Sequence, residues 1–334
     1  PLHELQAVAS GHFRNTMQKM LSKTEQEMKV DPDAKRRLPV PDPLTVPRVG
    51  TDGVSLVKSL MQDRSTDWTR AKRAAERIRD PNYSCKSFYE DCVAAFPELR
   101  LYVLDSPDGV ATTTSGRSAD DEYQRTMGAL FAVYWLMRLE GDGAQSFCYG
   151  VGSKWEPLSA ESEHPIRSPE ELTKRDLFLR NGRWKTFSEV LTMAGLLEGS
   201  GGKHNVERTL AMLALTAIHD IMKNQDLVPT VDPNSEFRGF KAGELINDHD
   251  IALAYFLETY PTLLPSFAGL PKSQQDSVKF TQSKMEYNMG WLVQAEAPPG
   301  PLFSKFRAVI QSGNAMSSDI AFYFVHWLTD LAGA

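Results

Sequence analysis

The chain has 334 residues, 41% of them hydrophobic and 24% charged, with a formal net charge of −6 at pH 7. This composition supports a sizeable core and argues against global disorder. The negative charge argues against general binding to nucleic acids or anionic membranes, which needs a basic surface. The odd number of cysteines, three, implies no disulfide framework, so we expect reduced thiols and an intracellular, cytoplasmic location. No stretch reaches the roughly 18 apolar residues of a membrane span, so no membrane segment is expected.

Residues 1–50 are predicted to form an N-terminal helix followed by a proline-rich arm. Apolar residues recur at helical spacing up to about residue 30, on an otherwise polar segment. Five prolines over 31–50 then exclude a helix and favour an extended chain: Pro32, Pro39, Pro41, Pro43 and Pro47. A polar helix with such an arm suits docking on a larger assembly, so residues 1–50 are a candidate protein-binding segment.

Residues 51–160 are predicted to form an α+β region. Helices are expected over 54–79 and 84–95. A β-hairpin is expected near 99–114, because residues 99–105 alternate and are rich in strand formers, and Ser106-Pro107-Asp108-Gly109 has turn chemistry. A further short strand is expected over 146–151.

Residues 161–334 are predicted to form a helical domain. Ser168-Pro169-Glu170-Glu171 is typical of a helix start, with an N-cap serine and proline at the first helical position. The glycine-rich segment 199–203 departs from the phosphate-loop motif and is interpreted as a connector. Later helices are expected over 186–197, 204–223, 241–259, 272–289, 301–312 and 317–332. The predicted fold class is therefore mainly α, a helical bundle with a small β-hairpin element in the N-terminal half.

The most suggestive chemistry is His219-Asp220, at the end of an apolar run that begins at Leu210. Burying an imidazole and a carboxylate is costly unless a partner satisfies them, and a divalent metal ion would do so. Lys223 follows one turn later on the same face, where it could hold a phosphate.

This segment resembles the HD superfamily of metal-dependent phosphohydrolases, in which a lysine often follows the His-Asp pair. The resemblance covers about residues 185–332. It implies an all-helical domain with one or two divalent ions (Mg, Mn, Fe or Zn) held by a histidine, the His-Asp pair and a distal aspartate. Asp330 stands where the final aspartate is expected, with His326 four residues earlier, and His249 stands where the family often supplies another histidine.

The family's first histidine should lie on a preceding helix. His204 is the nearest candidate, but on one continuous helix it would lie about 22 Å from His219 and could not share an ion. Glu189 could substitute for it. His249 and His326 also have simpler interpretations, as part of a helix N-terminal sequence and as a packed core residue.

The leading functional hypothesis is a metal-dependent phosphohydrolase acting on a small phosphorylated substrate. The candidate ligands are His219, Asp220, His249, His326 and Asp330. Lys223 is the candidate catalytic residue, with Lys305 and Arg307 as a basic wall for the substrate. Two alternatives stay open: a non-enzymatic helical subunit of a larger assembly, in which His219-Asp220 is a metal-free helix-end pair, and a di-iron oxygenase on the same scaffold.

Overall fold

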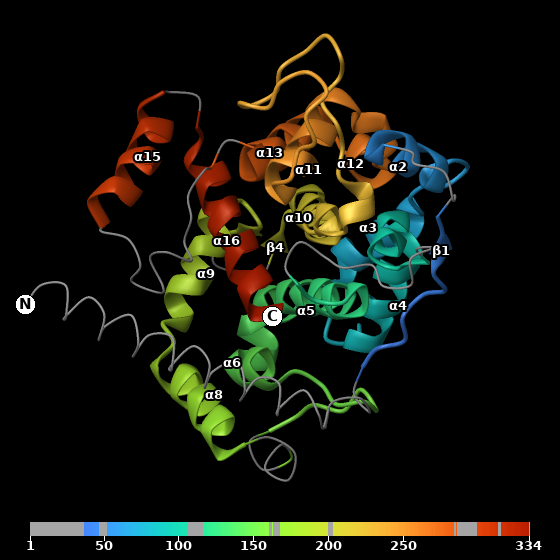
Figure 1. Cartoon of the computed structure of the whole chain (residues 1–334). Coiled ribbons are helices and arrows are strands. Elements are labelled where there is room, and N and C mark those ends of the chain that lie inside the picture. The colour runs from blue at the N-terminus through green and yellow to red at the C-terminus, as the bar shows by residue number, and fades with distance from the viewer. Residues whose placement is uncertain are drawn as a thin grey trace, which may run out of the picture.

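The computed structural model describes residues 37–46, 52–105, 116–159, 162, 168–199, 203–283, 285, 299–312 and 315–333. Helices account for most of these residues, which confirms the mainly-α prediction (Figure 1). Strands in the described ranges form two short two-stranded sheets. No helix among these residues is both long and apolar enough to cross a membrane. The predicted helix over residues 1–30 lies outside the described residues.

The elements of the N-terminal half are mostly helices that begin at capped residues. The Asp67 side chain accepts hydrogen bonds from two backbone amides, so a new helix starts there and the predicted helix 54–79 is in fact two. Ser84 caps the next helix, and its side chain accepts from the amide of Ser87. The elements are β1 (Leu44–Thr45), α2 (Gly53–Met61), α3 (Trp68–Arg77), α4 (Cys85–Ala95), η1 (Pro97–Tyr102), β2 (Leu104–Asp105), α5 (Ala119–Met137) and α6 (Leu139–Tyr149).

The predicted strand over residues 99–105 is largely wrong. Pro97 starts the 3-10 helix η1, and its apolar side chains are buried without alternating between two faces. Only β2 forms a strand, and it pairs in parallel with β1 from the proline-rich arm, a long-range partner that local sequence does not reveal. The expected turn and return strand, 106–114, lie outside the described residues.

The predicted strand over residues 146–151 is also wrong. Residues 146–149 continue α6, Gly150 ends the helix with a φ of 66°, and Val151 alone forms an isolated β-bridge, with Pro157. That left-handed conformation favours glycine, because it carries no Cβ. The alternation of the sequence there was too short to distinguish a strand from the last turns of a helix.

Most elements of the C-terminal half match the predicted helices, but the helix predicted over 204–223 ends at Ile218 and the one predicted over 186–197 ends at Met193. Ser168 caps α8 in a reciprocal capping box with Glu171, as its sequence indicates. Residues 241–248 are not helical, because Asp248 caps a helix that begins only at His249. The elements are α8 (Pro169–Asn181), α9 (Trp184–Met193), β3 (Leu197–Glu198), β4 (Lys203–His204), α10 (Val206–Ile218), η2 (Ile221–Lys223), η3 (Gln225–Leu227), α11 (His249–Thr259), η4 (Pro261–Leu263), α12 (Pro265–Ala268), α13 (Lys272–Ser283), α15 (Pro299–Gln311) and α16 (Ser317–Gly333).

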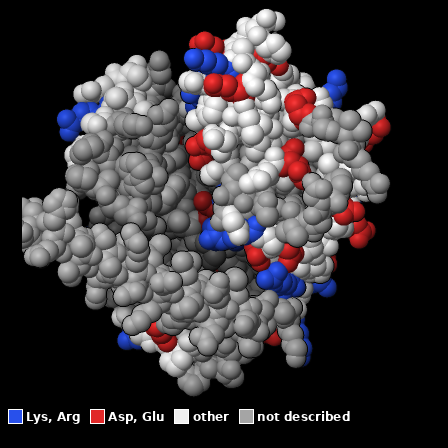
Figure 2. All heavy atoms as spheres, viewed as in Figure 1, with Lys and Arg blue, Asp and Glu red and all other residues white. Residues whose placement is uncertain are grey.

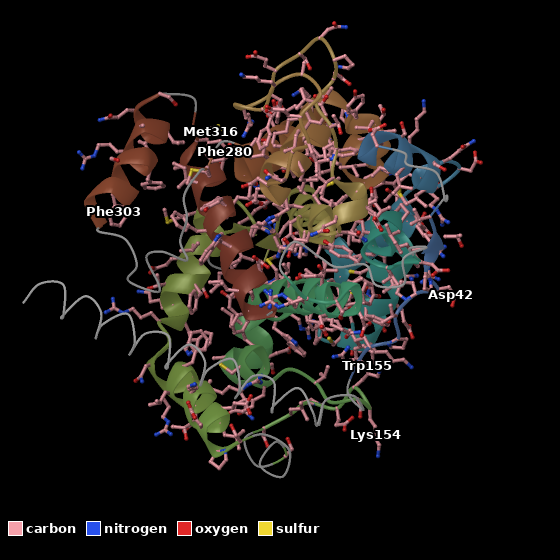
Figure 3. All side chains as sticks on the ribbon, viewed as in Figure 1. Asp42, Lys154, Trp155, Phe280, Phe303 and Met316 are labelled. Atoms are coloured by element: carbon pink, nitrogen blue, oxygen red, sulfur yellow. The ribbon has the colours of Figure 1, made fainter. Side chains whose placement is uncertain are left out.

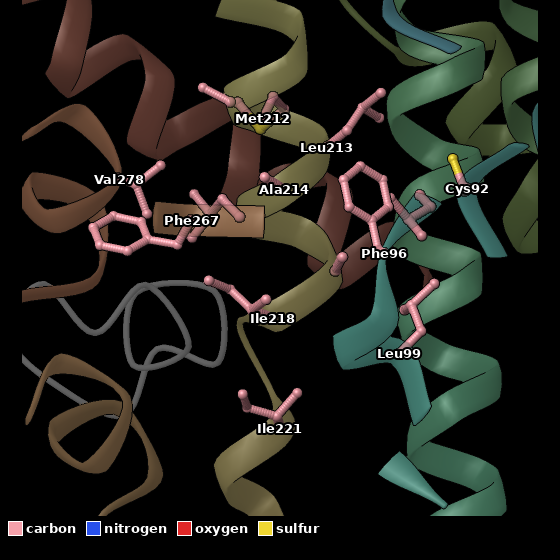
Figure 4. Close-up of a cluster of buried hydrophobic side chains, with 14 of the residues drawn as sticks. Cys92, Phe96, Leu99, Met212, Leu213, Ala214, Ile218, Ile221, Phe267 and Val278 are labelled. Atoms are coloured by element: carbon pink, nitrogen blue, oxygen red, sulfur yellow. The ribbon is translucent and has the colours of Figure 1, made fainter. Parts of the chain in front are cut away.

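Helix α10 runs through the centre of the main hydrophobic core. Its residues from Arg208 to Ile218 are all buried, so it has no solvated face. Figure 4 shows side chains of α10 between Phe267 and Val278 on one side and Phe96 and Leu99 on the other. The same core cluster contains residues from Leu44 to Val325, so the predicted 51–160 and 161–334 regions share one core.

Helix α16 crosses α5 at a pair of glycines. A Cβ at Gly128 would lie 2.5 Å from the carbonyl oxygen of Gly333, and a Cβ at Gly333 would lie 2.2 Å from the amide nitrogen of Ala129. Only residues without a side chain allow the two backbones to approach so closely. This contact brings the end of α16, one turn after Asp330, against α5 and beside the end of α10.

Candidate metal centre

The end of α10 presents His219 and Asp220 through an exchange of hydrogen bonds. In a continuing α-helix, the Asp220 amide would donate to the carbonyl oxygen of Thr216. Here that carbonyl accepts from His219 Nδ1 at 2.7 Å, and the Asp220 amide donates instead to the hydroxyl of Tyr102 at 3.2 Å. The helix therefore ends at this pair without leaving either buried backbone group unsatisfied.

The same exchange determines which nitrogen of His219 faces the site. A carbonyl only accepts, so Nδ1 carries the proton and Nε2 is directed at two carboxylates. Nε2 lies 3.2 Å from Asp330 Oδ1 and 3.3 Å from Asp220 Oδ2. One ligand atom from each of these three residues lies within 4.8 Å of the others, an arrangement that could hold a metal ion. A histidine that donates its second ring nitrogen to a backbone carbonyl is typical of metal ligands.

The two carboxylates favour a positive charge between these groups. Burial alone would lower the pKa of His219, but the carboxylates of Asp220 and Asp330 outweigh it and hold that pKa well above its ordinary value. Burial likewise opposes ionisation of Asp220, yet the charges of His219 and Lys223 lower its pKa. The cluster thus has two chemically reasonable states: a proton on His219 Nε2, or a cation in its place.

The two further candidate histidines lie beside the cluster. The ring of His326 packs edge-on against His219, with ring centres 5.1 Å apart. Burial, followed by the charge of His219, lowers the pKa of His326 to about 3, so it is neutral. Its Nδ1 is buried with no hydrogen-bond partner among the described residues. His249 Nε2 lies 4.0 Å from Asp220 Oδ1, on the other side of that carboxylate.

Lys223 lies in the candidate site, as its sequence position suggests. Its Nζ donates to Asp220 Oδ2 at 2.6 Å and lies 3.7 Å from Oε2 of the buried Glu122. The two predicted substrate-binding residues, Lys305 and Arg307, belong to α15. In Figure 1 this helix lies at the edge of the molecule, apart from α5, and Figure 3 labels its Phe303. Arg307 is exposed there, and the side chain of Lys305 is outside the described residues.

The two candidates for the missing first histidine are engaged elsewhere. His204 bonds through Nε2 to the carbonyl oxygen of Ala75 at 2.8 Å. Glu189 is exposed and lies 3.7 Å from Lys185. Tyr102 and Glu122, which contact the site from η1 and α5, had no sequence signal, because both come from segments about 100 residues earlier in the chain.

Comparisons with known proteins find no match to this chain. No protein-family model matches the chain, and neither a curated protein nor a solved structure does.

Proposed function

We propose that this protein is a divalent-metal-dependent phosphohydrolase that acts on a small phosphorylated substrate. One observation carries the proposal: the ligand atoms of His219, Asp220 and Asp330 converge within 4.8 Å, with the His219 tautomer set by Thr216. The unpartnered Nδ1 of His326 supports it, since a buried polar atom without a partner in a native site calls for an explanation. A divalent ion held there would lower the pKa of a water molecule and supply hydroxide near neutral pH.

The residues of this chain have separate roles in the proposed reaction. Water attacks phosphorus, the ester P–O bond breaks, and the leaving oxygen takes a proton, so the products are phosphate and an alcohol. Lys223 neutralises negative charge on the phosphate, and Asp220 orients that amine through their 2.6 Å hydrogen bond. His219 is held by Thr216 in the tautomer that leaves Nε2 free as a ligand.

The test is Mn²⁺ binding by calorimetry, together with hydrolysis of p-nitrophenyl phosphate. We expect about one ion per chain, and a loss of affinity of at least about a hundredfold in His219→Gln and Asp330→Asn, because each removes a ligand. His204→Gln is the matched control, since this histidine bonds only a backbone carbonyl and should leave binding unchanged.

Two results would contradict the proposal and favour its alternatives. If the wild type binds no divalent ion, and His219→Gln lowers stability alone, the cluster is an ion-paired helix end of a structural subunit, with His219 protonated. If the purified protein instead contains two iron atoms and consumes oxygen, the oxygenase alternative replaces hydrolysis.

A further inference from the structure

The carboxyl group of Glu98 is buried in the hydrophobic core, where acidic side chains are rarely found. Glu98 belongs to η1 and is 0% exposed. Leu99, the next residue, lies in the cluster of buried apolar side chains shown in Figure 4. By contrast, the Lys, Arg, Asp and Glu side chains visible in Figure 2 lie on the surface, where water can solvate their charges. A charge on Glu98 would therefore have to be stabilised by the protein itself.

The two oxygens of this carboxyl group have different surroundings. Oε1 accepts hydrogen bonds from the backbone amide of Ser266 at 2.8 Å and from the hydroxyl of Ser266 at 2.9 Å. Ser266 follows Pro265 at the start of α12, where the first backbone amides have no acceptor within the helix. Oε2 is buried and has no hydrogen-bond partner among the described residues. Glu98 thus joins η1 to α12 through Oε1 alone.

No cation in the described part of the chain forms an ion pair with Glu98. The 3-10 helix η1 packs mainly against α2, α4, α5, α10, α12 and η2. The cations of these elements and of η1 itself are exposed or engaged elsewhere: Lys58 is exposed, Lys86 lies near Glu90, Arg100 bonds the carbonyl of Asp42, Arg125 lies near Glu122, Arg208 pairs with Asp319, and Lys223 pairs with Asp220. The other titratable groups of these elements are acids, thiols and phenols, which add no positive charge.

Burial without a counter-ion favours the protonated form of a carboxyl group, because the neutral form loses less solvation than the charged form. Burial accordingly raises the pKa of Glu98 above its ordinary value, although hydrogen bonds from Ser266 and from its own backbone amide oppose the shift. Both donors of Ser266 meet Oε1, so the proton belongs on Oε2.

We infer that Glu98 is a neutral carboxylic acid in the folded protein and forms a pH-sensitive lock between η1 and α12. When Oε2 loses its proton to solvent, the carboxylate bears a charge that no described cation offsets and that water can solvate once the two elements separate. Because η1 also carries Tyr102, whose hydroxyl holds the Asp220 amide, this separation disturbs the support of the candidate metal centre. The inference goes beyond the proposed function and does not depend on a metal ion.

The test is urea unfolding of the metal-free full chain between about pH 4 and about pH 9, in the wild type and in Glu98→Gln, which mimics the neutral acid. In the unfolded chain Glu98 ionises near its ordinary pKa of 4.5, whereas in the folded chain it keeps its proton to a higher pH. Stability is therefore lost as the pH rises between these two pKa values. The ratio of unfolding equilibrium constants, wild type over Glu98→Gln, should rise above pH 4.5 by up to about tenfold per pH unit and then level off.

Glu76→Gln is the matched control, because Glu76 is exposed on α3 and water solvates it in both the folded and the unfolded chain. The corresponding ratio for this variant should stay constant with pH. Ser266→Ala keeps the test decisive if Glu98→Gln does not fold. It removes one hydrogen bond to the ionised carboxylate, so its unfolding constant should rise relative to wild type by up to about tenfold, at pH values above 4.5.

Three results would overturn the inference. The first is a ratio for Glu98→Gln that does not rise with pH over this range. The second is an equal rise for Glu76→Gln, which would assign the effect to the net charge of the protein. The third is a rise for Ser266→Ala confined to pH values below 4.5, which would show that Glu98 is ionised in the folded chain at neutral pH.

Discussion

Replacing Tyr102 with phenylalanine tests whether the helix end at Asp220 is held from η1. The hydroxyl of Tyr102 accepts from the Asp220 amide at 3.2 Å, and both residues are buried, 2% and 4% exposed. Among the described residues the Tyr102 hydroxyl is the acceptor of that amide, and the Thr216 carbonyl is already occupied by His219. Tyr102→Phe thus leaves a buried N–H unsatisfied, which costs about 1–3 kcal/mol of the free energy of unfolding.

The same change should also weaken the metal site, because Asp220 loses the contact that sets its backbone position. Groups that orient a ligand typically contribute about 10- to 100-fold in metal affinity, so Mn²⁺ should bind at least about tenfold more weakly in Tyr102→Phe. Urea unfolding measures the first effect and calorimetric Mn²⁺ titration the second. The two together separate positioning from general stability.

Tyr134→Phe is the matched control for this experiment. The Tyr134 hydroxyl is also buried, and it donates to the carbonyl oxygen of Tyr83 at 2.6 Å, away from the candidate centre. We expect a comparable loss of stability with Mn²⁺ affinity unchanged. If Tyr102→Phe reduces Mn²⁺ affinity no more than Tyr134→Phe does, Tyr102 supports the fold alone and the positioning argument is refuted.

Two further outcomes follow from the geometry. Because the carboxylates hold the pKa of His219 above its ordinary value, the metal-free site carries a proton near neutral pH. Mn²⁺ must displace this proton, so about one proton is released on binding and the affinity for Mn²⁺ rises with pH up to that pKa. Titration in buffers of different ionisation enthalpy measures the number of protons released. If no proton is released, His219 Nε2 is not a ligand. Gly128→Ala should lower the free energy of unfolding by about 1–3 kcal/mol, because its Cβ would meet the Gly333 backbone. The control Gly141→Ala has open space around it and should raise that free energy by about 0.5–1 kcal/mol. Equal shifts in melting temperature would refute the close crossing of α5 and α16.

The sequence by itself determined the helical class and most helix starts, because these depend on neighbouring residues. The capping box at Ser168 is complete within four residues, and the apolar run of α10 ends at His219-Asp220 in both the pattern and the structure. It also indicated that Asp330 lies near this pair, because the resemblance to the HD superfamily implies an aspartate at about this position. The predictions of short strands were wrong, because η1 is stabilised by tertiary packing and α6 ends at a glycine with positive φ. Alternation in the sequence reveals neither feature.

Only the tertiary structure decided which side chains surround the His-Asp pair. Tyr102 bonds the Asp220 amide and Glu122 lies beside Lys223, although both come from segments about 100 residues away, along a chain path that no local pattern encodes. The crossing at Gly128 brings α16 against α5, and the loss of the Thr216 carbonyl to His219 makes the Tyr102 hydroxyl necessary. Local sequence supplied the reactive residues. Long-range packing supplied the hydrogen bonds and charges that determine their protonation.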